Sequence, residues 1–523
     1  MAQGDFLIGA VGDVFLDRED PSTALNPVAP MQANESRSID VLVIGCGIAG
    51  LSAAVAARQA GATVAILERA PIEERGGNTR YTEAFMRMKS LDEVADDFES
   101  HFAANAGGHL DPELVAETAA DYENWPGIVK SLGFGDPEVI SAFASAAGPT
   151  MRWLTSFGLH FDFFPTPFLT TCTTRMGPRG GGLALVEALA AAAEKLGVEF
   201  HYETTAQDLL VDDEGAVIGV TARGPNGKRR AIHAHSVVLG SGGYEGSSEM
   251  MTRYVGPRSL FLRPVARGGY YNKGEGIAMA LRHGAAPCGD FGSYHAEPVD
   301  PRSGRPEPAI FIFSYGILVN QEGRRFVDEA PGTVDATYES ITRKIYEQTD
   351  GLAYVILDAR VHEVPNKQLA IRTDQPAIEA DSIDALARKL KIPPAALART
   401  IADYNGGCSP APFTPLQTDG HATTGIEPPK TNWAHPIDNG PYLAYPIMSS
   451  NVFTFGGLKV NGNAQVVAVD GRPITGLYAA GEVVGLYYRV YTGATSVLKG
   501  AVFGRLAGLD AAQRATTNTP VSR

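Results

Sequence analysis

The sequence predicts an α/β protein, and three neighbouring segments near the N-terminal end support this fold class. Residues 40–50 are an apolar strand that runs into a glycine turn, and residues 51–60 have the pattern of a helix. Residues 63–67 form a second apolar strand that ends at Glu68. Two short apolar strands joined by a helix are typical of a βαβ unit, whose strands run parallel. We therefore expect a parallel α/β domain in this part of the chain.

The glycine turn has the spacing of a dinucleotide-binding site. Gly45 permits a tight turn, Gly47 lets the backbone approach a pyrophosphate, and Gly50 lets the helix pack closely on the strand. The free N–H groups at the start of the helix attract the phosphates. Glu68 stands where a carboxylate accepts both hydroxyls of an adenosine ribose. The sequence therefore predicts a Rossmann-like dinucleotide-binding domain.

The C-terminal part of the chain indicates which dinucleotide is bound. Residues 475–482 end in a Gly-Glu pair, and a second glycine-bearing segment follows at 491–496. A nicotinamide enzyme rarely closes its cofactor site with its last strand. The long FAD molecule does reach distant parts of a chain, because it runs from the first turn across the sheet. We therefore expect FAD as the cofactor.

Several separate blocks, in a fixed order, resemble one family. These blocks are residues 45–50, 75–79, 240–244, 274–276, 293–296, 316–320 with 325–329, 454–458, and 479–482 with 503–505. They resemble the flavoproteins of the fumarate reductase, succinate dehydrogenase and 3-ketosteroid dehydrogenase family, and within it most of all the tricarballylate dehydrogenases. The resemblance runs from about residue 40 to about residue 512. It implies an FAD-binding domain of the glutathione-reductase type with an inserted α+β cap domain, and a substrate held between flavin and cap.

This resemblance divides the chain into segments of different function. We expect an N-terminal extension and linker at 1–39, an FAD-binding domain in two parts at 40–289 and 433–515, a cap or substrate domain at 290–432, and a tail at 516–523. Within the extension, residues 7–15 predict a short strand and residues 21–38 a linker. Within the FAD-binding domain we expect a helix at 183–196 and strands at 200–202, 206–211, 217–223 and 236–240.

The glycine turn and the family blocks together predict the flavin-binding residues. These are Gly45, Gly47, Ile48, Ala49, Gly50, Glu68, Arg69, Gly76, Gly77, Asn78, Thr79, Ala206, Gly240, Ser241, Gly242, Gly481, Glu482, Ser496 and Val497. A helix that begins near Ser496 is expected to direct its N–H groups at the N1/O2 edge of the flavin. The resemblance also implies that covalent flavin requires a histidine just before Gly76. Because Arg75 stands there, we expect noncovalent FAD.

The candidate catalytic residues follow from the resemblance and from the chemistry that such a site performs. Removal of two hydrogens from adjacent carbons requires a hydride acceptor, a base, and hydrogen-bond donors to a carbonyl or carboxylate oxygen. The resemblance implies that His295 contacts the substrate and that Tyr491 acts like the tyrosine that holds the carbonyl in ketosteroid dehydrogenases. Tyr315 and Tyr487 are further candidates, and Arg489 is the arginine we favour for a carboxylate. A packing or structural role is the alternative for each.

Three departures from the fumarate reductases narrow the expected reaction. No arginine occurs at 311–315, the second substrate histidine falls at about Val452, and the last substrate arginine is Tyr491. We therefore expect an FAD-dependent oxidoreductase acting on CH–CH groups. This dehydrogenase, similar to tricarballylate dehydrogenase, forms a C=C bond α,β to a carboxylate or carbonyl of a small or alicyclic organic acid. The alternatives are a cyclic ketone or 3-ketosteroid dehydrogenase, and a flavin-binding redox sensor without turnover.

The net charge and the cysteines argue against several kinds of partner and site. The net charge of −15 argues against nucleic acid or an anionic membrane surface as partner. The cysteines are Cys46, Cys172, Cys288 and Cys408; they are scattered without metal-ligand spacing, so we predict no metal site and a reducing cytoplasm. The expected partners are a small organic acid or ketone as substrate and, as the resemblance implies, a membrane-associated electron-acceptor protein.

Overall fold

The computed structural model describes residues 39–105, 110–163 and 175–518. The predicted strand at 7–15, the linker at 21–38 and Cys172 lie outside these residues. The last helix, α12 (Ser496–Asn518), runs beyond the predicted domain end at residue 515. Among the described residues, no helix combines the length and the apolar character that crossing a bilayer requires.

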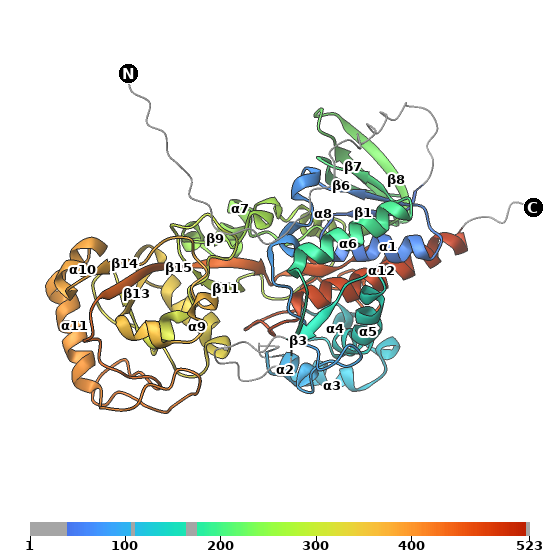
Figure 1. The fold of residues 1–523 in the computed structure, drawn as a ribbon. Coiled ribbons are helices and arrows are strands. Elements are labelled where there is room, and N and C mark those ends of the chain that lie inside the picture. Colours follow the sequence, from blue (N-terminus) through green and yellow to red (C-terminus); the bar gives the residue numbers. More distant parts are fainter. Residues whose placement is uncertain (1–38, 106–109, 164–174, 519–523) are drawn as a thin grey trace, which may run out of the picture. The chain divides into compact units, whose positions relative to one another are not determined.

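An eight-stranded sheet carries the glycine turn (Figure 1). Its path runs β17 (Gln465–Val467), β18 (Pro473–Ala479), β8 (Arg229–Leu239), β1 (Ile39–Ile44), β2 (Val64–Leu67) and β5 (Glu199–His201). The strands from β18 to β5 are parallel, with Leu42 of β1 between Ala65 and Val237. The central strands β1 and β2 and the second half of β8 are buried apolar runs, as expected for parallel strands covered on both faces. The predicted α/β fold class is confirmed.

The antiparallel part of this sheet extends beyond the prediction. β6 (Thr205–Val211) pairs with β7 (Val217–Arg223), and β7 pairs with the first half of β8. We expected β8 to begin at residue 236, whereas it begins at Arg229. Residues 229–235 are largely polar and exposed, so the apolar pattern marks only the buried half that pairs with β1.

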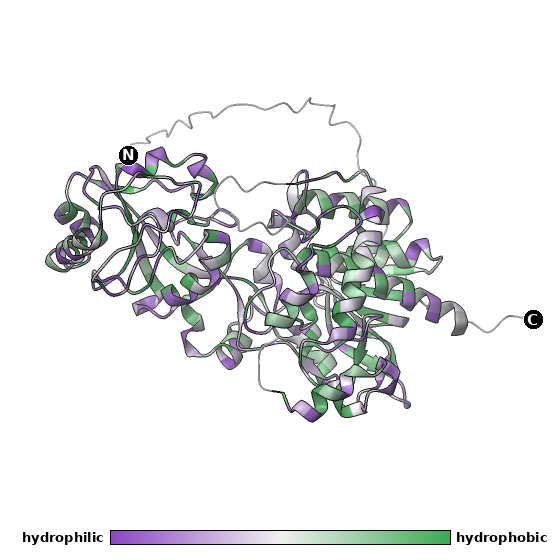
Figure 2. Ribbon diagram, turned by 90° about the horizontal axis from the view of Figure 1, so that it is seen from below, coloured by the Kyte–Doolittle hydropathy of each residue, from purple (hydrophilic) through white to green (hydrophobic). Residues whose placement is uncertain are grey.

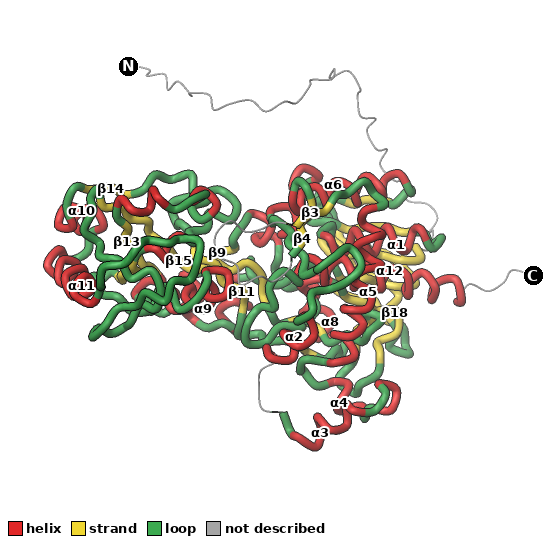
Figure 3. Tube along the Cα trace, turned by 60° about the horizontal axis from the view of Figure 1, so that its bottom comes forward, coloured by secondary structure: helices red, strands yellow, loops and turns green. Residues whose placement is uncertain are grey.

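Two helices lie against each other beside this sheet (Figure 3). They are α1 (Ile48–Gln59) and α12. Their close approach depends on glycine, because a Cβ at Gly504 would lie 2.3 Å from the Ala49 carbonyl oxygen and one at Gly508 would lie 2.2 Å from that of Ala53. The N-terminal end of α12 is thereby held close to the glycine turn at the start of α1.

The cap is built on a sheet that is antiparallel except at one short strand. Its order is β11 (Tyr294–Val299), β15 (Tyr442–Thr454), β13 (Leu352–Leu357) and β12 (Ile317–Asn320), and both β14 (Ile378–Ala380) and β9 (Arg263–Pro264) pair with β15, β9 in parallel. Its helices are α9 (Val334–Tyr346), α10 (Ile383–Leu390) and α11 (Pro394–Gly407). The predicted return to the FAD-binding domain at residue 433 precedes β15, which pairs with cap strands. The chain rejoins the first sheet only at β17.

The remaining helices and strands lie outside these two sheets. They are α2 (Phe98–Asn105), α3 (Pro112–Ala116), α4 (Gly127–Ser131), α5 (Pro137–Thr155), α6 (Gly181–Lys195), α7 (Ser248–Tyr254), α8 (Glu275–Arg282), β3 (Phe161–Phe163), β4 (Met176–Pro178), β10 (Pro287–Cys288) and β16 (Gly457–Leu458). Figure 2 shows hydrophobic residues concentrated on the strands and the inner parts of the helices, where separate buried clusters form the cores of the FAD-binding domain and the cap.

Candidate active site

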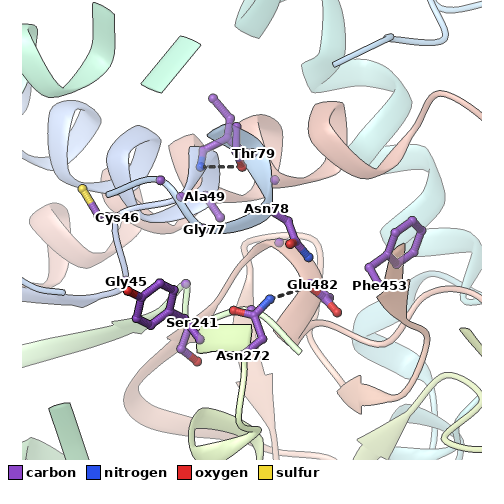
Figure 4. A pocket seen from close by; sticks show the side chains of 18 of the residues that line it. Gly45, Cys46, Ala49, Gly77, Asn78, Thr79, Ser241, Asn272, Phe453 and Glu482 are labelled. Atoms are coloured by element: carbon purple, nitrogen blue, oxygen red, sulfur yellow. Dashed lines mark hydrogen bonds between the residues drawn. The ribbon is translucent and has the colours of Figure 1, made fainter. Parts of the chain in front are cut away.

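A pocket lies at the carboxyl ends of the parallel strands (Figure 4). Gly45 follows β1, Glu68 follows β2, Gly240 follows β8, and Gly481 follows β18 closely; all four residues line it. The pocket contains about 1330 Å³ of space not filled by atoms, open solvent included. Its lining runs from the glycine turn at Gly45 to Phe453 and Tyr487 on the cap side, as a long ligand such as a dinucleotide requires.

Every predicted flavin-binding residue except Gly50 lines this pocket. Gly50 acts in packing, because a Cβ there would lie 2.0 Å from the carbonyl oxygen of Gly45. Gly47 is different, because a Cβ there would lie 3.5 Å from the Gly76 carbonyl oxygen, an ordinary contact. The protein itself therefore has room for a side chain at Gly47. The missing side chain instead leaves backbone open to a ligand in the pocket.

Two hydrogen bonds within the protein hold the Glu68 carboxylate in place. Its Oε2 accepts a hydrogen bond from the Cys46 N–H and its Oε1 accepts one from the Ala70 N–H, both at 2.8 Å. Burial raises the pKa of this carboxyl group, and the two backbone donors oppose that shift. Each carboxylate oxygen can accept more than one hydrogen bond, so both remain able to receive ribose hydroxyls.

A network of acids and amides lines the middle of the pocket (Figure 4). Glu245 Oε1 accepts hydrogen bonds from Asn78 Nδ2 at 2.7 Å and from Asn272 Nδ2 at 2.6 Å. Glu482 Oε1 accepts one from the Thr454 N–H at 2.8 Å. Burial raises the pKa of both carboxyl groups.

This network leaves buried polar atoms without a protein partner. Within the described residues these atoms include Asn78 Oδ1 and Ser241 Oγ. Buried polar atoms in native proteins are normally hydrogen-bonded, so these two indicate a polar ligand. The ribityl chain and ring edge of FAD offer hydrogen-bonding groups of this kind. The pocket residues therefore fit FAD, which Gly47 would hold at the pyrophosphate and Glu68 at the ribose.

Some pocket residues carry no sequence signal that we recognised. Asn272 and Lys499 line the pocket, and Glu245 joins its network, although none belongs to the predicted set. Lys499 Nζ donates to the Val484 carbonyl oxygen at 2.8 Å, and burial lowers its pKa to about 7. Glu245 directly follows the predicted glycine block at 240–244, which is the one signal that could have marked it.

Arg75 points away from the flavin site. Its guanidinium donates to Glu187 Oε2 at 2.6 Å, Glu194 Oε1 at 2.8 Å and the Tyr202 hydroxyl at 3.0 Å. These contacts hold it against α6 and β5, and a guanidinium cannot form the histidyl bond of covalent flavoproteins.

Acid precipitation is therefore expected to release all the yellow colour into the supernatant. Absorbance spectra of supernatant and washed pellet measure this directly. Flavin absorbance remaining on the denatured chain would contradict noncovalent binding.

An aromatic group lies at the boundary between pocket and cap. The ring centroids of His295 and Tyr491 are 4.5 Å apart, and Phe453 lies 5.0 Å from Tyr491 and 5.2 Å from His295. Tyr487 is 5.3 Å from Tyr491, and both Tyr487 and Phe453 line the pocket. The structure thus brings together three predicted residues, His295, Tyr487 and Tyr491, from distant parts of the chain.

The Tyr491 hydroxyl lies at the N-terminal end of α12. Its oxygen accepts hydrogen bonds from the N–H groups of Thr495 and Ser496, each at 3.0 Å, and its O–H donates to Ser496 Oγ at 3.0 Å. Free N–H groups and the helix dipole favour negative charge at such a helix end. The arrangement can therefore stabilise an oxygen atom on which charge develops.

His295 is buried and neutral at neutral pH. Burial, with the nearby charge of Arg343, lowers its pKa to about 3. Its Nε2 lies 2.7 Å from the hydroxyl of Tyr338, a residue of α9 that no motif predicted. Its Nδ1 is buried and has no hydrogen-bond partner within the described residues.

Two predicted residues lie outside this group. The Tyr315 hydroxyl donates to the Pro415 carbonyl oxygen at 2.6 Å, and its ring packs against Phe413 and Trp433 in the cap. Arg489 is exposed and lines no part of the described pocket. The cap core therefore holds Tyr315, while solvent surrounds Arg489.

Among the described residues, three arginines that lie near His295, Tyr338 or Phe311 are already paired. Arg343 pairs with Glu339 at 3.0 Å, and Arg175 pairs with Asp335 at 3.0 Å. Arg372 pairs with Glu83 at 3.3 Å. A substrate carboxylate would therefore compete with a protein carboxylate for each of these three guanidinium groups.

The fold and this site together define the class of protein. Residues of the first βαβ turn and of the last helix line one dinucleotide pocket, and aromatic and acid–amide groups lie beside it. This arrangement is that of an FAD-dependent oxidoreductase. Residues 40–498 match the model of the FAD binding domain family, and the chain belongs to this family. The predicted family and the predicted FAD cofactor are thereby confirmed.

The relatives include proteins named as reductases and proteins named as dehydrogenases. The chain is 27% identical over 494 residues to the probable fumarate reductase Ifc3 of Shewanella frigidimarina, covering 92% of this chain and 76% of that protein. It is 25% identical to a 4-oxocyclohexanecarboxylate 2-dehydrogenase of Sinomonas cyclohexanicum, covering 88% and 90% of the two chains. The structure of 3-ketosteroid-Δ4-(5α)-dehydrogenase from Rhodococcus jostii RHA1 matches with a TM-score of 0.62 and 27% identity, covering 92% of this chain and 98% of that one.

Proposed function

We propose that the protein is an FAD-dependent dehydrogenase that forms a C=C bond α,β to the carbonyl group of a small or alicyclic substrate. The observation that carries this proposal is the position of the Tyr491 hydroxyl. It lies at the start of α12, held by two backbone N–H groups, next to His295 and the pocket-lining Phe453. A phenol held in this way can donate its proton to a substrate oxygen.

The residues of the chain act on the substrate oxygen and its surroundings. When bound, FAD supplies the acceptor for the hydride that leaves the β-carbon. As a base takes the α-proton, negative charge grows on the carbonyl oxygen, and the Tyr491 O–H turns from Ser496 Oγ to donate to it. The N–H groups of Thr495 and Ser496 keep the phenol oxygen in place during this change. Phe453 and Tyr487 keep water away from the reacting carbons.

The charges near the pocket favour a ketone over a carboxylate. Binding a carboxylate in a buried site calls for an arginine free to form a bidentate pair. Each of the three arginines near this site is paired with a protein carboxylate: Arg175, Arg343 and Arg372. Burial also raises the pKa of the Glu297 carboxyl group to about 7, so this region disfavours negative charge. A tricarboxylate, which the resemblance to tricarballylate dehydrogenases suggested as substrate, meets the same difficulty. The likeness to the 4-oxocyclohexanecarboxylate and 3-ketosteroid dehydrogenases supports a cyclic ketone, and a ketosteroid is the alternative within this class.

Anaerobic mixing with a substrate panel tests the proposed function. Oxidised protein is expected to lose its flavin absorbance near 450 nm with cyclic ketones, including 4-oxocyclohexanecarboxylate or a 3-ketosteroid, and to keep it with succinate and tricarballylate. The physical reason is that only the ketones place a carbonyl oxygen at Tyr491 without an arginine. Bleaching by succinate or tricarballylate alone would contradict the ketone assignment.

The reduced flavin must then pass its electrons on. Relatives of this chain include a protein named fumarate reductase (cytochrome) of Shewanella frigidimarina. We therefore include an electron-carrier protein at the membrane in the proposal, as the acceptor that reoxidises the flavin.

A further inference from the structure

The hydroxyl of Tyr338, a residue of α9, has one hydrogen-bonding contact within the described residues, and it is with His295. The two atoms, Tyr338 Oη and His295 Nε2, are 2.7 Å apart. The Tyr338 ring lies edge-on to the His295 ring at 5.8 Å and to the Phe311 ring at 5.4 Å. Within the described residues no other atom shares a hydrogen bond with this hydroxyl. The direction of this one hydrogen bond therefore decides how the imidazole presents its other nitrogen.

The acid–base character of the two groups favours one direction. If the Tyr338 O–H donates to Nε2, then the neutral ring carries its proton on Nδ1, and the Nδ1–H is left without a protein partner. If Nε2–H donates to Oη instead, the Tyr338 O–H and the Nδ1 lone pair are left without one. Each direction leaves one donor and one acceptor unpaired, but an imidazole nitrogen is a far better proton acceptor than a phenol oxygen, so the hydrogen bond from the O–H to Nε2 is favoured.

The ring must be neutral for this choice to exist, because an imidazolium carries both protons. Burial and the positive charge of Arg343 oppose protonation of His295. Arg175 also lies close enough to Tyr338 to act on it. The imidazole is therefore a neutral group whose tautomer is set by its neighbour.

Helix α9 holds Tyr338 firmly in this place. The next residue, Glu339, forms an ion pair with Arg343 and accepts a hydrogen bond from the Tyr491 N–H at 3.4 Å. One turn earlier, Asp335 pairs with Arg175 at 3.0 Å. The same face of α9 thus contacts the Tyr491 loop and the His295 strand, and it fixes the two groups relative to each other.

We propose that Tyr338 is a positioning residue that holds His295 as the Nδ1–H tautomer, so that His295 donates a hydrogen bond to the substrate oxygen. This inference rests on the proposed function for the identity of the oxygen, but the tautomer itself does not. His295 and Tyr491 then supply two donors, and His295 is not the base that removes the α-proton. A buried Nδ1–H without a protein acceptor is the group that a carbonyl oxygen would satisfy.

The tautomer can be measured in the holoprotein without any substrate. Protein labelled with ¹⁵N only at histidine gives long-range ¹H–¹⁵N spectra in which protonated and unprotonated ring nitrogens differ widely in shift. His295 is identified among the 11 histidines as the signal lost in His295→Gln. We expect the wild type to show protonated Nδ1, and Tyr338→Phe to move the ring toward protonated Nε2. The matched control is Tyr315→Phe, which removes a cap hydroxyl that contacts Pro415 and should change nothing.

The wild-type spectrum alone can overturn the inference, even where Tyr338→Phe fails to fold. Protonated Nε2 in the wild type, or an unchanged tautomer in a yellow Tyr338→Phe protein, would do so. With a ketone that bleaches the flavin, Tyr338→Phe should raise the half-saturating concentration by about fivefold to tenfold and change the limiting rate by less than about threefold. An equal loss in the limiting rate would contradict a positioning role. If the tautomer is found but no ketone bleaches the flavin, the proposed function fails and the assignment of Tyr338 stands.

Discussion

Gly47→Val is expected to yield a folded protein without colour. A Cβ at this position would lie 3.5 Å from the Gly76 carbonyl oxygen and 3.6 Å from Thr79 Oγ1, so the first carbon of the new side chain meets no clash in the protein. The rest of the side chain occupies the place where the backbone approaches the pyrophosphate. We expect FAD affinity to fall by at least about 100-fold, or ~2.7 kcal/mol. The ratio of flavin to protein absorbance after purification measures the effect.

The matched control is Gly304→Val, at an exposed cap position where an added Cβ meets no atom within 4 Å. This variant should retain as much FAD as the wild type. The thermal midpoint of Gly47→Val should equal that of wild-type apoprotein, which separates loss of FAD from loss of fold. Stoichiometric FAD in Gly47→Val would show that the pyrophosphate lies elsewhere.

Tyr491→Phe is expected to retain FAD and to reduce it slowly. The substitution removes the O–H that would donate to the substrate oxygen in the transition state, while the ring contacts with His295 and Phe453 can remain. Loss of one such donor typically slows the chemical step by about 10²–10³-fold. Stopped-flow measurement of flavin reduction with a saturating cyclic ketone gives the rate.

A control separates this effect from general damage. Tyr315→Phe removes a hydroxyl that contacts Pro415 in the cap, distant from this group. It should reduce its flavin within about threefold of the wild-type rate, as expected where no transition-state interaction is lost. If Tyr491→Phe also reacts at the wild-type rate, the tyrosine serves packing alone and the reaction must use other donors.

Local sequence patterns predicted the parts of the fold whose shape depends on nearby residues. The glycine turn, α1 and β2 appear within a few residues of their expected positions, because Gly45 and Gly50 have backbone roles that other residues cannot fill. Pairing between distant strands was not visible in the same way. β15 joins the cap sheet through β11 and β13, and its apolar sequence does not show which sheet receives it.

The same distinction applies to the site. Motif residues such as Asn78 and Glu482 line the pocket because the motifs encode the backbone that carries them. Tyr338 was missed because its contact with His295 depends on how α9 packs against β11, which no local pattern records. Tyr315 and Arg489 were chosen by residue type and motif neighbourhood. Their positions are set instead by the cap core and by solvent.

The central claim is that this pocket desaturates a carbonyl compound rather than reducing an unsaturated acid. It is tested most directly by an anaerobic titration of the oxidised protein with a bleaching cyclic ketone, followed by mass analysis of the product. The account predicts one equivalent of the corresponding enone for each FAD bleached, and it predicts that fumarate does not reoxidise the flavin after chemical reduction. Rapid reoxidation by fumarate, with no ketone able to bleach the oxidised protein, would contradict it.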